Sequence, residues 1–214
     1  MRKTFRAAVC MLAAFALWTA AVCCIDVRPI GPKESAVGFA ALNGFFHRLT
    51  GTHMSLYVLT DWLSLVPLGI TAGFAALGLM QWIRRRSILK VDGSILWLGG
   101  FYIAMAAAYA LFERFAVNYR PVLIDGCLEA SYPSSTTVLV LCVMPTAAMQ
   151  CKARIKKAAV RRCALAVMTA FAVLMVVCRL ISGVHWLTDI IGGALLSAGL
   201  VKMYSAVCGL KSAR

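Results

Sequence analysis

The stretch CALAVMTAFAVLMVVCRLISGVHWLTD, residues 163–189, joins a long apolar run to a short polar turn. Its first part, Cys163–Cys178, carries no charged side chain, and a second apolar run follows over Trp186–Val207. A membrane-spanning helix needs about 20 predominantly apolar residues. Two such runs on either side of a short turn predict a helical hairpin in a bilayer, with Arg179 and His185 at the turn.

The composition of the whole chain also indicates a membrane protein. Hydrophobic residues make up 62% of the 214 positions and charged residues only 14%, whereas soluble domains carry about 25% charged residues. The formal net charge is +14, but the lysines and arginines form short clusters between apolar runs, not one basic face. Membrane topology accounts for this pattern, so we expect no binding to nucleic acid.

Apolar runs long enough to cross a bilayer recur along the chain. The expected spans are Ala7–Cys24, Met54–Ile83, Ile95–Phe115, Ser135–Gln150, Cys163–Cys178 and Trp186–Val207. We therefore predict an all-α polytopic membrane protein of about six helices in one bundle. No repeat or linker divides it, so residues 1–214 are predicted to form a single domain. The first run also fits a cleavable signal peptide, but its length and the bulky Val22-Cys23-Cys24 favour a retained helix.

The basic residues predict the orientation of the bundle. Of the 22 lysines and arginines, 16 fall at the amino end, after the second and fourth spans, or at the carboxyl end. Because such residues accumulate in cytoplasmic loops, both termini are predicted to be cytoplasmic in a cell membrane. The segments Ile25–His53, Asn118–Ser134 and Leu180–Val184 would then lie on the extracytoplasmic side.

The nine cysteines are scattered through apolar stretches, and their spacing fits neither a zinc site nor a disulfide framework. Buried cysteine behaves as a small hydrophobic residue. We therefore expect no metal and no cofactor.

Polar residues gather at the extracytoplasmic ends of the later spans. His185 and Asp189 are four residues apart, so on a helix they share a face. The carboxylate could accept the proton of one imidazole nitrogen and leave the other free to attack an electrophile. A purely structural pair that closes the helix end is the alternative.

Three further features suit an anion. Arg120 and Arg179 offer planar guanidinium groups that match phosphate oxygens, although either could be an interfacial anchor. Pro133 is expected in the first turn of the fourth span. The N–H groups of Ser134, Ser135 and Thr136 would then point at an anion bound at the helix N-terminus, although such a segment is also an ordinary helix start.

Taken together, these residues resemble the three signature motifs of the type 2 phosphatidic acid phosphatase superfamily, which includes membrane lipid phosphate phosphatases and vanadium haloperoxidases. The motifs are Arg120-Pro121, Pro133-Ser134-Ser135-Thr136, and Arg179 with His185 and Asp189, within residues 113–189. The resemblance implies a nucleophilic His185 that forms a phosphohistidine and is oriented by Asp189. It also implies that Arg120, Arg179, Ser134 and the amide of Ser135 hold the phosphoryl oxygens, and that no metal is needed.

Two positions depart from the family pattern. Glu113 stands where the first motif usually has Lys, and Thr136 stands where the second motif has a His that protonates the leaving group. General acid catalysis is worth roughly 10²–10⁴-fold. A diphosphate leaving group needs the acid less; alternatively another residue donates the proton, and the candidates on that side are His47, His53, Asp125 and Glu129.

Asp61 and Glu113 are expected to pair with Arg114 or Arg120, or to replace part of the missing basic motif.

The leading hypothesis is an enzyme that removes phosphate from a lipid phosphate or diphosphate, such as undecaprenyl diphosphate, at the extracytoplasmic face. Its partners would be the bilayer and a phosphorylated membrane lipid. One alternative is a catalytically impaired relative that binds, flips or regulates phosphorylated lipids. Another is a phosphotransferase in which an alcohol replaces water.

Overall fold

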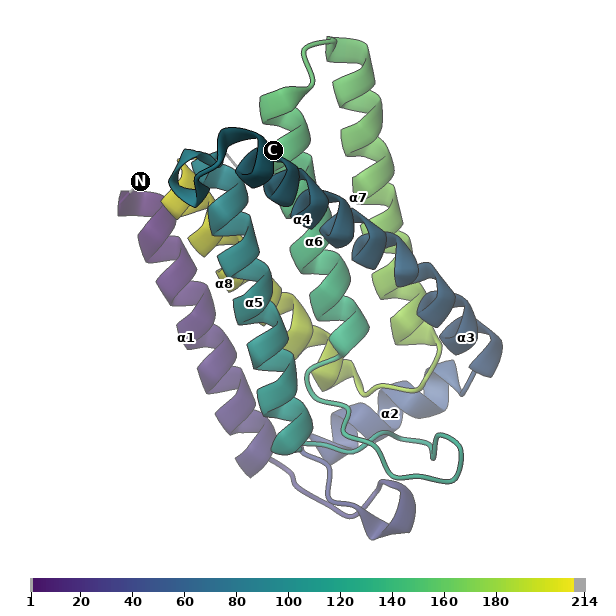
Figure 1. Cartoon of the computed structure of the whole chain (residues 1–214). Helices are drawn as coiled ribbons and strands as arrows, with labels where there is room; N and C mark the ends of the chain where they lie inside the picture. The colour runs from purple at the N-terminus through teal and green to yellow at the C-terminus, as the bar shows by residue number, and fades with distance from the viewer. Residues whose placement is uncertain (1, 210–214) are drawn as a thin grey trace.

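The long apolar runs of the sequence are helical in the computed structural model, which describes residues 2–209 (Figure 1). The helices are α1 (Arg2–Cys24), α2 (Ala40–Thr50), α3 (Met54–Leu63), α4 (Leu65–Arg85), α5 (Gly93–Arg114), α6 (Ser135–Arg154), α7 (Ala158–Ile181) and α8 (Leu187–Cys208). Short 3₁₀ turns, η1 and η2, cover Pro32–Glu34 and Ile88–Lys90.

Six helical stretches in the described part of the chain are long and apolar enough to cross a membrane, which confirms the predicted all-α membrane fold. Five of them are single helices, α1 and α5 to α8. The other is Met54–Arg85, where α3 and α4 meet at Ser64 and together cover 32 residues. This is more than the roughly 20 residues a bilayer requires, and Figure 1 shows it crossing the bundle obliquely.

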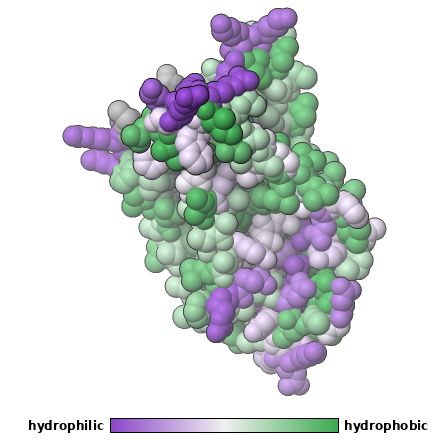
Figure 2. Space-filling model, in the orientation of Figure 1, coloured by the Kyte–Doolittle hydropathy of each residue, from purple (hydrophilic) through white to green (hydrophobic). Residues whose placement is uncertain are grey.

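Helices α6 and α8 form the centre of the bundle. About 67% of the most apolar window of α6 and 56% of that of α8 is buried, against 17% or less for the other spans. α8 packs along α1 on one side and against α6 on the other. The outer helices expose large apolar side chains, and Figure 2 shows an apolar middle zone with polar side chains towards the two ends. This pattern fits lipid as the surrounding solvent.

The two ends of the bundle differ in what they carry. Both described chain ends lie together at one end, here called the terminal end, and the connections α5–α6 and α7–α8 lie at the other, here called the loop end (Figure 1). At the terminal end Asp92 binds Arg85 and Arg154, each at 3.0 Å, and thereby links α4, α5 and α6. The cytoplasmic placement of this end stays a prediction. Lys211 and Arg214, which contribute to it, lie outside the described residues.

The segment Ile25–His53, expected only as a connection, contains the short helix α2. α2 packs against the start of α8. The Asn43 side chain donates to the Thr188 hydroxyl at 3.0 Å and accepts from the Thr188 backbone N–H at 3.2 Å. This paired contact fixes the first turn of α8.

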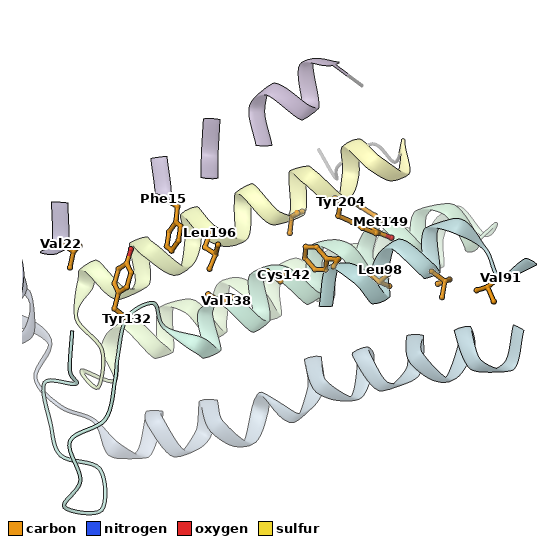
Figure 3. Close-up of a cluster of buried hydrophobic side chains, with 13 residues drawn as sticks. Phe15, Val22, Val91, Leu98, Tyr132, Val138, Cys142, Met149, Leu196 and Tyr204 are labelled. Atoms are coloured by element: carbon orange, nitrogen blue, oxygen red, sulfur yellow. The ribbon is translucent and has the colours of Figure 1, made fainter. Parts of the chain in front are cut away.

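A buried cluster runs between α1, α5, α6 and α8, and Tyr132 closes it at the loop end (Figure 3). The Tyr132 ring stacks on Phe15 and meets Phe112 edge-on, and its hydroxyl lies 2.7 Å from the Thr19 hydroxyl. The ring lies so close to Gly192 that a Cβ atom there would be 2.6 Å from it. Tyr132 thus anchors the connection that precedes α6.

We expect Gly192→Ala to destabilise the protein by about 1–3 kcal/mol, because the added methyl group overpacks the Tyr132 site. The matched control is Gly100→Ala on α5, where a Cβ atom meets nothing within 4 Å. Thermal unfolding of both variants in detergent, followed by tryptophan fluorescence, measures the effect. Equal melting temperatures for the two variants would contradict this account of the Tyr132 anchor.

Candidate active site

A cavity of about 710 Å³ opens near the loop end, lined by residues of helices α3 to α8 and of the loop-end connections. Its polar part includes Arg120, Arg179 and His185. Its apolar part includes Leu68 and Met105. A cavity with a cluster of cationic groups beside an apolar wall suits a phosphorylated amphiphile.

His185 is not part of a helix, contrary to the prediction that it shares a helical face with Asp189. α7 ends at Ile181 and α8 begins at Leu187, so His185 lies in the connection. Its Nδ1 lies 3.1 Å from the backbone carbonyl oxygen of Ser131, which only accepts hydrogen bonds. Its Nε2 lies 3.5 Å from Nη1 of Arg120, which only donates. These two neighbours assign the proton to Nδ1 and leave the lone pair on Nε2.

Asp189 supports this connection from the first turn of α8. One carboxylate oxygen accepts the backbone N–H of Trp186 at 2.9 Å, and the other accepts the Asn118 amide at 3.3 Å. The nearest approach to His185 Nδ1 is 3.7 Å, which is longer than a hydrogen bond. The expected direct bond from the imidazole to Asp189 is therefore replaced by the bond to Ser131. Asp189 instead holds the turn and places a negative charge beside the ring.

Burial sets the protonation state of His185. The side chain is 4% exposed, and loss of hydration penalises the imidazolium ion. This lowers the pKa of His185 to about 4; Asp189 opposes the shift, while Arg120 and Arg179 add to it. The imidazole is therefore neutral at neutral pH, as a nucleophile must be.

Arg120 lies in the connection between α5 and α6 and is 8% exposed. Its Nε forms an ion pair with Glu129 at 3.0 Å. Its guanidinium carbon also lies 5.6 Å from the centre of the Tyr57 ring. One face of the guanidinium is thus supported by an aromatic ring, while one edge faces His185.

Arg179, in the last turn of α7, is 2% exposed. Its Nη1 lies 3.1 Å from the Asp61 carboxylate and 3.0 Å from the Thr60 hydroxyl, and its guanidinium carbon is 4.7 Å from the centre of the Tyr57 ring. The expected pairing of Asp61 with Arg114 or Arg120 is therefore wrong. Among the described residues nothing accepts a hydrogen bond from Arg179 Nε, and a buried donor of this kind is available to an anion.

The second motif differs in part from the expected anion site. The backbone N–H of Ser134 donates to the backbone carbonyl of Asp189 at 3.1 Å, and its hydroxyl accepts from Thr137 at 3.0 Å. Ser135 and Thr136 occupy the first turn of α6 and line the cavity. First-turn N–H groups have no acceptor within their own helix, so these two positions remain suited to an anion.

Sequence reasoning missed four residues that complete the site. Tyr57 and Thr60 contact the arginines, Asn118 holds Asp189, and Ser131 accepts the imidazole proton. The Ser131 hydroxyl lines the cavity region and has no hydrogen-bond partner among the described residues. Asn118 and Ser131 lie two residues before the motifs that hold Arg120 and Pro133, which is the only signal the sequence offers.

The four candidate proton donors differ in whether they line the cavity. His47 bonds to the backbone carbonyl of Gly183 at 3.2 Å, and His53 bonds to that of Thr50 at 2.9 Å. Neither these two residues nor Asp125 lines the cavity, whereas Glu129 does.

Within residues 2–209, no cluster of histidine, cysteine, aspartate or glutamate is arranged to hold a metal ion.

The fold and the site thus define a membrane helical bundle with a neutral histidine and two arginines in the lining of one cavity. Residues 104–209 match the family model described as PAP2 superfamily. This match includes all three motifs, and the chain belongs to the PAP2 superfamily.

One solved structure is similar over nearly the whole chain. It is described as the crystal structure of the first transmembrane PAP2 type phosphatidylglycerolphosphate phosphatase from Bacillus subtilis. The identity is 18%, the match covers 94% of this chain and 95% of that one, and the TM-score is 0.59. This likeness supports the membrane fold. The comparison with curated proteins gives no significant match.

We expect the imidazole of His185 to titrate near pH 4 and not near the ordinary value of about 6.5, because burial disfavours the charged ring. The ring nitrogen shifts of ¹⁵N-histidine-labelled protein, recorded against pH, measure this directly. The chain has three histidines, so a His185→Gln variant assigns the signal. A midpoint at or above 6.5 would be inconsistent with the buried, neutral imidazole.

Proposed function

We propose that the protein is a phosphatase that acts on a lipid phosphate or lipid diphosphate at the extracytoplasmic face of a cell membrane. The observation that carries the proposal is His185, whose Nε2 faces Arg120 Nη1 at 3.5 Å and which lines one cavity together with Arg120 and Arg179. PAP2 membership supports phosphoryl chemistry. The lipid-phosphate class named for the similar solved structure supports a lipid substrate.

In the proposed reaction the phosphoryl group lies between the two arginines. Arg179 Nε, which has no partner among the described residues, would bind one phosphoryl oxygen. Arg120 and the first-turn N–H groups of Ser135 and Thr136 would bind the others. Nε2 of His185 then attacks phosphorus, the bond to the leaving oxygen breaks, and a phosphohistidine forms.

The proton on Nδ1 stays with the imidazole during this step. Phosphorylation makes the ring cationic, and the carboxylate of Asp189, 3.7 Å from Nδ1, stabilises that charge. The Ser131 carbonyl keeps the ring oriented by accepting the same proton. Water then attacks phosphorus, releases phosphate and restores the neutral histidine.

The cavity also supports an amphiphilic substrate. Its walls include apolar side chains of α4, α5 and α6 next to the polar groups, namely Leu68, Met105, Phe112, Val138 and Leu139. A lipid chain would lie along these side chains while its phosphate meets the arginines.

The replacement of the family lysine by Glu113 and of the family histidine by Thr136 supports the second candidate, a relative that binds phosphorylated lipid with little or no turnover.

We expect His185→Ala to abolish phosphate release from phosphatidic acid and from undecaprenyl diphosphate, because it removes the nucleophile. The control is His53→Ala, whose exposed side chain lies outside the cavity. Both variants are assayed in detergent after size-exclusion chromatography shows that they are folded. Phosphate release that persists in His185→Ala would refute the proposed nucleophile, and no release from the wild type would favour the binding-only candidate.

A further inference from the structure

The cavity lacks the histidine that protonates the leaving group in the family pattern, since Thr136 occupies that position. An alkoxide is a strong base and leaves slowly unless a proton reaches it, so the reaction needs a positioned acid. On the basis of the proposed function, we propose that Glu129 is this general acid. It would also be the general base for the water in the second step.

The geometry places Glu129 one side chain away from the nucleophile. Its Oε2 lies 3.0 Å from Nε of Arg120, and Nη1 of the same guanidinium lies 3.5 Å from Nε2 of His185. Arg120 therefore lies between the carboxylate and the attacking nitrogen. A phosphoryl group that binds Arg120 and meets His185 will have Glu129 as an immediate neighbour.

The backbone fixes this position as well. The N–H of Arg120 donates to the carbonyl of Glu129 at 3.0 Å, and the N–H of Ser131 donates to the carbonyl of Asn118 at 2.9 Å. The segment that carries Glu129 is thus paired with the segment that carries Arg120. The Glu129 side chain keeps 39% of its surface exposed, so it can exchange protons with water.

The other carboxylates in the cavity are less suited to this role. Asp61 belongs to the group that holds Arg179, together with Thr60 and the carbonyl of Tyr57. That guanidinium makes no hydrogen bond to His185 in the described structure. Glu113 lies at the end of α5, interacts with Tyr109, and forms no ion pair among the described residues. Glu129 is the carboxylate that shares its cation with the nucleophile.

Substrate binding provides the reason for Glu129 to carry a proton. In the empty site the carboxylate is paired with Arg120, and an incoming phosphate competes for the same guanidinium. A carboxylate that loses its cation and faces an anion binds a proton more readily. The substrate would thereby convert Glu129 into its acidic form as it occupies the site.

The steps balance in atoms and charge. As Nε2 of His185 bonds to phosphorus, the phosphorus–oxygen bond breaks and the proton of Glu129 moves to the departing oxygen, which leaves as an alcohol. Water then attacks the phosphohistidine while the carboxylate of Glu129 accepts its proton. The phosphorus–nitrogen bond breaks, hydrogen phosphate leaves, and both side chains return to their starting forms.

The test compares two substrates with different leaving groups. Phosphatidic acid releases an alcohol that needs a proton, whereas para-nitrophenyl phosphate releases a stable anion that does not. For Glu129→Gln in full-length detergent-purified protein we expect a loss of about 10²–10⁴-fold on phosphatidic acid. On para-nitrophenyl phosphate we expect a change of less than about threefold, since the acid contributes little there. The control Asp125→Asn, in the same connection but outside the cavity, should retain both activities.

A second variant protects the test against an indirect effect on Arg120. The double variant Glu129→Gln with Thr136→His returns an acid to the family position. Its activity on phosphatidic acid should be at least about tenfold higher than that of Glu129→Gln alone. Equal losses of Glu129→Gln on both substrates would overturn the proposal, because they would mean that Glu129 only positions Arg120. Unchanged activity on phosphatidic acid would overturn it too. No activity of the wild type on either substrate would overturn the phosphatase function itself, and the role of Glu129 with it.

Discussion

The buried carboxylate of Asp189 is the point on which the site depends. It is fully buried and accepts hydrogen bonds from Trp186 and from Asn118, while the backbone carbonyl of the same residue accepts the N–H of Ser134. One residue therefore joins the two connections of the loop end, α5–α6 and α7–α8. A buried charge is tolerated only when it is paired or well hydrogen-bonded. The negative charge that satisfies these donors also lies beside the imidazole that would become cationic during phosphoryl transfer.

The two buried arginines are likewise each paired with a group of opposite charge. Arg120 pairs with Glu129 and Arg179 with Asp61, and the ring of Tyr57 lies near both guanidinium groups. The two arginines and their partners Glu129 and Asp61 together carry no net charge in the empty site, and a neutral His185 adds none. Removing one partner of a buried pair is costly because it leaves an unpaired charge. In the proposed mechanism, a phosphate substrate takes the place of a carboxylate and so keeps each arginine paired.

The sequence predicted the parts of the protein that depend on local patterns. Apolar run length predicted the spans, and the resemblance to the family motifs pointed to Arg120, Arg179 and His185. Contacts between distant segments left no such pattern, so the pairing of Asp61 with Arg179, 118 residues apart, was assigned to the wrong arginine. Likewise, the spacing of His185 and Asp189 predicts that both lie on one helix, whereas α8 begins only at Leu187. The imidazole instead donates its proton to the backbone carbonyl of Ser131, in the α5–α6 connection. No spacing within the motif reveals this contact.

The central claim is that His185 becomes covalently phosphorylated. The most direct measurement is rapid mixing of the wild type with ³²P-labelled phosphatidic acid, quenching in alkali, and mass spectrometry of the labelled peptide. The account predicts a phosphoryl group on His185 that survives alkali, is lost in acid and does not form in His185→Ala. Phosphate release without any labelled protein, or a label on another residue, would contradict it.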